Sequence, residues 1–455
     1  MTTEQAIVKE KETHHGLASK SLRYFAVSYL NKYLKYPFAP FHVNIFDTLK
    51  KGDLLNEIIA FRESSKSTVV TLIYVLWCIL YQKRNFIIIC SDSYTQAQLH
   101  LANVIYELEN NTQILADFGY LASDKWTEGN FVTKTGIRVM ARGTGSKIRG
   151  LRHLEHRPDL FIGDDLENSE LVRTKEQRDK TEKWLISEVI PAVNQEEGQV
   201  IIVGNMLHND SLMSRLKENQ EWSTLEIPIV KDGKPAWKAR HSLSTIDKIK
   251  NTVGSLSFAQ EYMLTPIMDG DQIIRNSWIR YYQKIEPRFI KNVVIALDPA
   301  ISEKESADKS AFTVWCKYTD DCLYLLDYIN EQMSFDNQIK TIRNLYNSYK
   351  EFEPMIVIED VAYQKALIQH LTKSHYLPVK PVKPKGDKRS RLMEISVFFE
   401  NGLIHFKKNH DEVVAQLVNF GVDRYDDLVD SSVYGIKYLL EVNRIRGFTK
   451  TNLKI

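Results

Sequence analysis

One segment near the N-terminus, residues 56–81, constrains the fold of this chain more than any other. It predicts a β-strand, a short polar turn and then a helix from Val69 to Tyr81. The turn holds a Lys66-Ser67 pair just before the helix, where free backbone N–H groups and the helix dipole favour a bound anion. Lys66 is expected to reach the terminal phosphates of a nucleotide, and the Ser67 hydroxyl is expected to bind Mg²⁺.

The glycines of a phosphate-binding loop with the pattern G-x-x-x-x-G-K-[ST] are absent from this segment. Ala60 and Ser65 occupy the two glycine positions. Taken alone, the segment fits a plain strand–helix turn with a solvated lysine at least as well, so the assignment depends on residues further along the chain.

Length, charge and cysteine content limit the class of protein. A chain of 455 residues is too long for one ordinary core and predicts two domains. The formal net charge is only +2, so an argument for nucleic-acid binding must depend on local basic patches. Four cysteines without paired metal spacing favour a reducing cytosolic compartment. The polar segment 1–15 does not resemble a signal peptide, and the apolar run 69–81 is shorter than the about 20 residues that span a bilayer.

Apolar strands alternate with helical segments along the chain, which predicts an α/β fold. Several strands are continuously apolar, as in parallel sheets covered on both faces, and end in polar or acidic residues. Ligands bind at that carboxyl edge of a parallel sheet. The strands are expected at 86–90, 137–141, 160–163 and 200–203, and a second, mixed series at 293–297, 312–316, 323–328 and 355–359. The expected divisions are a polar lead with a helical segment (1–37), a first domain (38–228), a linker or lid (229–290), a second domain (291–447) and a tail (448–455).

Three acidic residues follow the strand at 160–163. A hydrophobic strand that ends in an acid pair is what a Walker B element requires, with one acid holding Mg²⁺ and the next polarising the attacking water. We assign Asp164 to Mg²⁺, while either Asp165 or Glu167 activates water. An acidic loop after a buried strand is the alternative.

Two further segments fit a nucleotide site. The basic stretch 144–152 contains Arg149 and Arg152, either of which could stabilise phosphoryl charge in cis or toward a neighbouring subunit. Solvated arginines, or contacts to DNA phosphates, explain the stretch equally well. Asn205 follows the strand at 200–203 and would lie beside the phosphate site, unless it is an ordinary strand end.

A second set of acids lies in the C-terminal part. Asp298 and Glu359 each end a strand, and Asp426, Asp427 and Asp430 lead into a helix, where residues three or four apart share a face. Acids from these distant stretches can converge on two divalent metals that hold the attacking and leaving oxygens of a phosphodiester. Oxygen ligands favour Mg²⁺ or Mn²⁺, and no His/Cys set suggests zinc.

A dense basic segment precedes the last of these acids. It is interleaved with prolines and suits contacts to a phosphate backbone without base readout, although a solvated loop is the alternative. The residues expected to contact DNA are Lys383, Lys385, Lys388, Arg389 and Arg391.

Taken in order, these motifs resemble the large terminase subunit of tailed bacteriophages over about residues 38–441. The segments that carry the resemblance are Arg62-Glu63-Ser64-Ser65-Lys66-Ser67, with Thr68 following; Ile148–Arg152; Arg157–Glu167; Val203–His208; Leu297-Asp298-Pro299; Ile358-Glu359; Gly386–Arg391; and Asp426-Asp427-Leu428-Val429-Asp430. The Arg-Pro-Asp…Asp-Asp-x-Glu string and the final Asp-Asp-x-x-Asp are the most specific, and the order of the pieces matters more than any one of them.

The resemblance implies an N-terminal P-loop ATPase domain of the ASCE type, with a parallel sheet, and a C-terminal RNase H-like nuclease domain with a mixed sheet. It implies ATP and Mg²⁺, with Mn²⁺ possible at the nuclease site, and ATP-driven movement of double-stranded DNA. The implied partners are a procapsid with its portal protein, a small terminase subunit and further copies in a five-membered ring. The implied location is the host cell cytoplasm, with no membrane.

The resemblance also suggests roles for single residues. Arg149 is the first choice for an arginine finger and Arg152 the second, and Arg62 is a candidate sensor of the ATP state. Asn205 stands where the family more often has threonine. A helicase–nuclease or repair resolvase with the same two chemistries, and a DNA-binding or portal-adaptor protein with inactive sites, are the alternatives.

Overall fold

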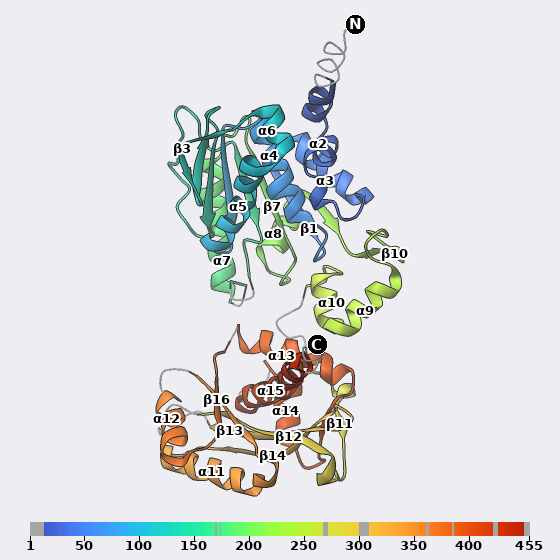
Figure 1. The fold of residues 1–455 in the computed structure, drawn as a ribbon, viewed down its shortest axis with the longest axis vertical. Helices are drawn as coiled ribbons and strands as arrows, with labels where there is room; N and C mark the ends of the chain where they lie inside the picture. Colours follow the sequence, from blue (N-terminus) through green and yellow to red (C-terminus); the bar gives the residue numbers. More distant parts are fainter. Residues whose placement is uncertain are drawn as a thin grey trace, which may run out of the picture. The chain divides into compact units, whose positions relative to one another are not determined.

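The computed structural model divides into two compact units (Figure 1). It describes residues 13–168, 171–172, 174–266, 272–299, 309–360, 364–384, 386–421 and 426–449. Residues 1–249 and 257–268 form the first unit, and residues 250–256 and 269–455 form the second. The expected linker, 229–290, is thus divided between the two units. None of the described helices is both long enough and apolar enough to cross a membrane.

The first unit is built on an eight-stranded sheet with the strand order β3-β4-β5-β2-β6-β7-β1-β8. All neighbouring pairs are parallel except β3–β4 and β4–β5. The strands are β1 (Leu55–Ala60), β2 (Phe86–Ser91), β3 (Ala122–Thr127), β4 (Asn130–Thr133), β5 (Arg138–Gly143), β6 (Leu160–Asp164), β7 (Gln199–Gly204) and β8 (Ser223–Ile227). The central strands are buried along almost their whole length because helices cover both of their faces.

The helices of this unit begin where the sequence supplies caps. Ser93 accepts the Gln96 N–H at the start of one helix, and Pro40 occupies the first turn of another. The expected helix over 69–81 begins as a π-helical segment, Thr68–Tyr74, before it becomes α-helical. The α-helices are α2 (Leu22–Tyr29), α3 (Pro40–Lys51), α4 (Val75–Leu80), α5 (Tyr94–Asn110), α6 (Thr112–Phe118), α7 (Lys175–Trp184), α8 (Leu212–Glu218), α9 (Leu243–Val253) and α10 (Ser255–Glu261). The end of α9 and the start of α10 belong to the second unit.

The second unit has a seven-stranded mixed sheet with the order β11-β17-β14-β13-β12-β15-β16. The strands β12, β13 and β14 are antiparallel neighbours, and the remaining pairs are parallel. The strands are β11 (Arg280–Tyr281), β12 (Ile290–Asp298), β13 (Ser310–Tyr318), β14 (Leu323–Glu331), β15 (Met355–Glu359), β16 (Val379–Val382) and β17 (Ile404–Phe406). The helices are α11 (Phe335–Ser348), α12 (Gln364–His375), α13 (Lys388–Glu400), α14 (Asp411–Val418) and α15 (Asp427–Thr449).

Alternation along the strands separates two cores in this unit. In β12, Val294 and Ala296 face the core made with α13, α14 and α15, whereas Val293 and Ile295 face the core made with α11 and α12. The parallel-rich first sheet and this mixed second sheet confirm the predicted α/β fold class with two domains.

A glycine lets α15 lie directly on the second sheet. A Cβ atom on Gly435 would come within 2.7 Å of Trp315 Cδ1, a distance that real side chains do not tolerate. The close approach positions the first turn of α15, which carries Asp427 and Asp430, near the end of β12.

Candidate functional site

The predicted phosphate loop joins β1 to the π-helical segment and turns without glycine. Glu63 and Ser65 adopt left-handed backbone conformations, with φ of 67° and 65°, which L-residues adopt at a cost. The Ser64 carbonyl accepts a 3.0 Å hydrogen bond from His42 Nε2. His42 Nδ1 accepts the Ala39 N–H, so Nε2 carries the proton. Burial lowers the pKa of His42 to about 4, which keeps this support of the loop neutral.

The loop meets the ends of two other strands at the carboxyl edge of the sheet. Lys66 Nζ donates to Asn205 Oδ1 at 3.0 Å, and Ser67 Oγ donates to Asp164 Oδ1 at 2.9 Å. Thr71, one turn after Ser67, donates to Asp164 Oδ2 at 2.5 Å. The strand order places β7 between β1 and β6, which explains how residues nearly 100 and 140 positions apart meet.

The two remaining acids after β6 have different surroundings. Both oxygens of Glu167 lie 2.9–3.0 Å from the backbone N–H of Leu212, the first residue of α8. Burial raises the pKa of Glu167 to about 7. Asp165 remains accessible from the solvent, yet desolvation by the surrounding protein raises its pKa to about 6; the Asp164 charge adds to this shift, and Lys66 opposes it. No described residue donates a hydrogen bond to the Asp165 carboxylate.

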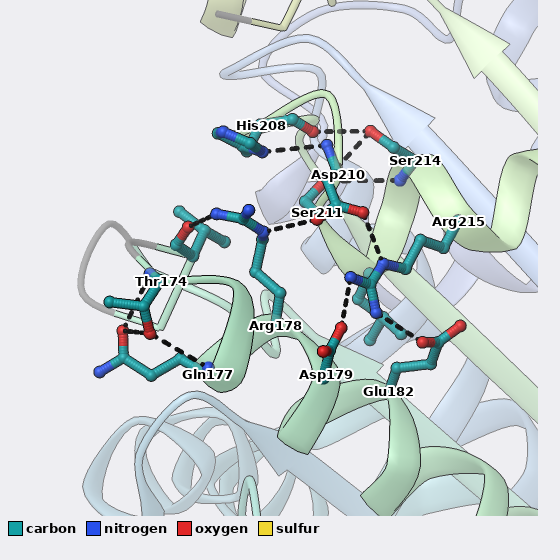
Figure 2. A network of polar contacts seen from close by, with 12 residues as sticks. Thr174, Gln177, Arg178, Asp179, Glu182, His208, Asp210, Ser211, Ser214 and Arg215 are labelled. Atoms are coloured by element: carbon teal, nitrogen blue, oxygen red, sulfur yellow. Dashed lines mark hydrogen bonds and ion pairs between the residues drawn. The ribbon is translucent and has the colours of Figure 1, made fainter. Parts of the chain in front are cut away.

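Figure 2 shows a polar network that holds the start of α8. Asp210 accepts hydrogen bonds from Arg178 Nε and Arg215 Nε, both at 2.9 Å. Arg215 also pairs with Asp179 and Glu182 on α7. Because Leu212 follows Asp210 closely, the network fixes the N–H group that contacts Glu167.

These residues surround a pocket of about 470 Å³. Its lining includes Arg62, Lys66, Ser67, Asp165, Glu167 and Asn205, together with residues that the sequence did not single out: Ser91, Asp92, Gln96, His100, Asn168, Leu212, Met213 and Glu261. Arg62 forms a 2.5 Å ion pair with Glu261 of α10 at the pocket wall. Arg149 and Arg152 are exposed and do not line the pocket.

A second hollow of about 140 Å³ borders the other side of the same loop. Ser65 and Thr68 contribute to it, along with the aromatic side chains of Tyr36 and Trp237 and the guanidinium of Arg240. Glu63 does not line it but is held by an ion pair with Arg240. No sequence pattern pointed to this hollow, whereas the four-residue spacing of Thr71 from Ser67 could have identified Thr71.

In the second unit, four acids lie near one another. Asp298 ends β12 and Glu359 ends its parallel neighbour β15, one residue beyond the paired Leu297 and Ile358. Asp427 and Asp430 belong to the first turn of α15. The pKa of Asp298 is raised to about 8, first by burial and then by the negative charges of Asp430, Glu359 and Asp427, against the opposing charge of Lys388.

Two cations of α13 neutralise part of this cluster. Arg391 Nη2 lies 2.5 Å from Asp430 Oδ1, and both side chains are almost fully buried. Lys388 Nζ lies 2.8 Å from Asp426 Oδ1 and 3.3 Å from Asp430 Oδ2. In the described part of the chain, no three His, Cys, Asp or Glu side chains are arranged to hold one metal ion.

The basic residues expected to bind DNA do not all lie on one surface. Lys388 and Arg391 face the acids, and Lys383 is exposed after β16. Arg389 lies in the first turn of α13. Lys385 lies outside the described residues.

Comparison with known proteins agrees with this architecture. Residues 295–439 match the family model described as the terminase RNase H-like domain. No curated protein sequence matches the chain. A structure of the large terminase from a thermophilic bacteriophage aligns with 89% of this chain and 100% of its own, at 11% identity and a TM-score of 0.59. A structure of that same protein with ADP aligns with 89% of this chain and 100% of its own, at 11% identity and a TM-score of 0.58. Its structure with ATP-gamma-S aligns with 88% of this chain and 98% of its own, at 9% identity and a TM-score of 0.55. The matched C-terminal domain and the shared fold of both units confirm the resemblance of this chain to phage large terminase subunits.

Proposed function

We propose that the first unit binds and hydrolyses ATP. The observation that carries this proposal is the convergence of Lys66, Ser67 and Asn205 on one pocket beside a helix N-terminus, with Asp164 hydrogen-bonded to Ser67 just behind the pocket wall. A cationic amine, a hydroxyl and a carboxylate at that place suit phosphates and a divalent cation. The large terminase of the thermophilic bacteriophage, which has the same fold, is known in complex with ADP and with ATP-gamma-S.

Each side chain has a role in this proposal. Lys66 binds the terminal phosphates, and Ser67 with Asp164 would hold Mg²⁺, since their hydroxyl and carboxylate oxygens already lie 2.9 Å apart. Asp165 takes the proton of the attacking water, because its carboxylate lines the pocket and is not held by a described donor. Glu167 instead positions α8 through Leu212. Arg62 senses the nucleotide, and Arg149 or Arg152 completes the site of a neighbouring copy.

The hollow beside Tyr36 and Trp237 suits the nucleoside end of the same ligand. It shares Ser65 and Thr68 with the loop, so a nucleotide whose phosphates contact Lys66 can reach it. The Arg240 guanidinium lies over the Tyr36 and Trp237 rings, and its outer face would stack on a base.

The rate of ATP hydrolysis tests this part of the proposal. Lys66→Ala should lower it at least about 100-fold, because an electrostatic contact to the transferred phosphoryl group is lost. Lys50→Ala, an exposed lysine of α3, is the matched control and should leave the rate unchanged. Equal hydrolysis by the Lys66→Ala variant and the wild type would contradict the assignment.

We further propose that the second unit cleaves DNA with divalent metals held by Asp298, Glu359 and Asp427. These carboxylates would have to move closer together when metal binds, because no three described acids are arranged around one ion here. The mutual repulsion of these acids contributes to the raised pKa of Asp298, and a bound cation would relieve it. Mg²⁺ or Mn²⁺ would supply the charge that stabilises the phosphodiester transition state. Asp430 pairs with Arg391 and Asp426 pairs with Lys388, so these two acids orient the basic side chains. Either acid could become a metal ligand if its ion pair opened.

Plasmid nicking in Mn²⁺ tests this second activity. Asp298→Asn should lower the nicking rate at least about 100-fold, whereas Asp336→Asn on α11, at the opposite face of the sheet, should have no effect. A plasmid left intact by the wild-type protein would argue against the nuclease assignment.

Both activities together fit a motor that packages viral double-stranded DNA into a procapsid. In this proposal, ATP hydrolysis moves DNA through the portal protein, a small terminase subunit delivers the DNA, and five copies act as a ring in the host cell cytoplasm. Stimulation of the ATPase by procapsids, but not by DNA alone, distinguishes this motor from a helicase–nuclease.

A further inference from the structure

A basic hollow lies beside the acid cluster of the second unit. It has a volume of about 170 Å³ and is lined by Lys380, Lys383, Arg391, Lys437, Tyr434 and Tyr438, with Val382, Pro384 and Glu441 completing it. Four of the nine lining residues are cationic and one is acidic. Arg391, Lys437 and Lys380 each form an ion pair with an acid, namely Asp430, Glu394 and Glu441. Lys383 forms none with a described residue, so the hollow keeps a positive charge that favours an anion.

One face of α15 links the hollow to the acids. Asp430, Tyr434, Lys437 and Tyr438 follow each other at helical spacing, so they form one stripe. The positions of Asp430 and Lys437 are about 10 Å apart along the helix axis. Arg391 touches both places, because it pairs with Asp430 and also lines the hollow.

One buried hydroxyl of the hollow lacks a partner among the described residues, and one lysine there is paired with an exposed acid. Tyr434 is 3% exposed, and its hydroxyl has no hydrogen-bond partner in the described part of the chain. Lys380 Nζ lies 4.9 Å from the centre of the Tyr438 ring and 3.6 Å from a carboxylate oxygen of Glu441, whose side chain is itself largely exposed. A buried hydroxyl without a partner is costly, and an acceptor brought by a ligand would satisfy it.

The size of the hollow determines which form of nucleic acid fits. A volume of about 170 Å³ equals roughly six waters at about 30 Å³ each. That space admits a phosphate with part of its nucleoside and excludes a duplex. Bases in a duplex are stacked on each other, whereas an unpaired base can stack on an aromatic side chain.

We propose that this hollow binds one unpaired nucleotide of the DNA strand near the cleavage site. Lys380, Lys383 and Lys437 contact its phosphate, and Tyr438 stacks on its base. The inference rests on the proposed nuclease function and deepens it. The second unit binds a frayed or cut strand about 10 Å along α15 from the acids that would hold the catalytic metals.

The test is binding of the full-length protein to two fluorescent DNAs in EDTA, which prevents cleavage. One is a blunt duplex, and the other is the same duplex with a single-stranded overhang. The wild type should prefer the overhang. Tyr438→Leu should weaken overhang binding by about 5-fold to about 150-fold, while Tyr438→Phe should retain it.

Charge variants provide a second readout that does not depend on packing. Lys383 is exposed, so Lys383→Ala leaves the core intact; it should reduce the salt dependence of overhang binding by about 0.7 in log–log slope. Lys340→Ala, an exposed lysine of α11 at the opposite face, is the control and should change nothing.

Two results separate this inference from the nuclease assignment. Equal effects of the Tyr438 and Lys383 variants on blunt and overhanging DNA, or no effect on either, would overturn the proposal. Failure of the wild type to nick plasmid in Mn²⁺ would instead count against the nuclease assignment, and the EDTA binding data would still decide the role of the hollow.

Discussion

Replacing Glu167 with glutamine should stabilise the first unit, and only at neutral to alkaline pH. Burial raises the pKa of Glu167 from 4.5 to about 7. Between these values the folded state binds more protons than the unfolded state, so stability falls as pH rises from about 4.5 to 7. Above pH 7 the buried charge costs about 3 kcal/mol, at about 1.4 kcal/mol per pKa unit. Glu167→Gln removes the charge and keeps an oxygen for the Leu212 N–H.

Calorimetric unfolding at pH 5 and pH 8 measures this effect. At pH 8 the transition of the first unit should rise by about 6–12 °C, and at pH 5 it should move little. Glu196→Gln, an exposed carboxylate in the same unit, should change stability by less than about 0.5 kcal/mol at both pH values. Destabilisation by Glu167→Gln at pH 8, or a gain of the same size at pH 5, would refute the reasoning. Retained ATPase in Glu167→Gln, with a loss of about 100-fold or more in Asp165→Asn, would assign water activation to Asp165.

Three other perturbations follow from the structure. Ser65→Gly should raise the free energy of unfolding by about 1 kcal/mol, because Ser65 has φ of 65°, while Ser64→Gly should lower it; urea unfolding compares the two. Gly435→Ala should destabilise the second unit by about 1–3 kcal/mol in the same assay, because its Cβ would clash with Trp315. Because the pKa of His42 is lowered to about 4 in the folded state, only the unfolded state binds a proton between pH 6.5 and 4. The free energy of unfolding therefore falls by about 3 kcal/mol as pH drops through that window. His42→Gln should flatten this pH dependence, which urea unfolding at several pH values measures.

Strand ends were the most informative local signal. Apolar runs terminated by polar residues predicted β6 before Asp164, β12 before Asp298 and β15 before Glu359, because burial on both faces leaves a continuous apolar pattern. Convergence at the carboxyl edge then follows from parallel pairing. This argument could not identify Trp237 or Arg240, because they lie beside the phosphate loop in space but more than 160 residues away in sequence.

Side-chain partners were decided only by tertiary contacts. The sequence placed Asp165 and Glu167 two residues apart with equal claims, and only the position of α8 separates them, since Leu212 approaches Glu167 alone. It likewise marked Asp430 as a ligand without showing that Arg391 is buried against it.

Local pattern, by itself, determined that the chain has two α/β units and which acids end their strands, because periodicity and strand-end chemistry act over a few residues. The tertiary structure decided that Ser65 can turn without glycine, with His42 supporting the loop, and that a basic hollow lies beside the acidic first turn of α15. Those outcomes depend on packing between distant segments, whose distances and burial no short window of sequence contains.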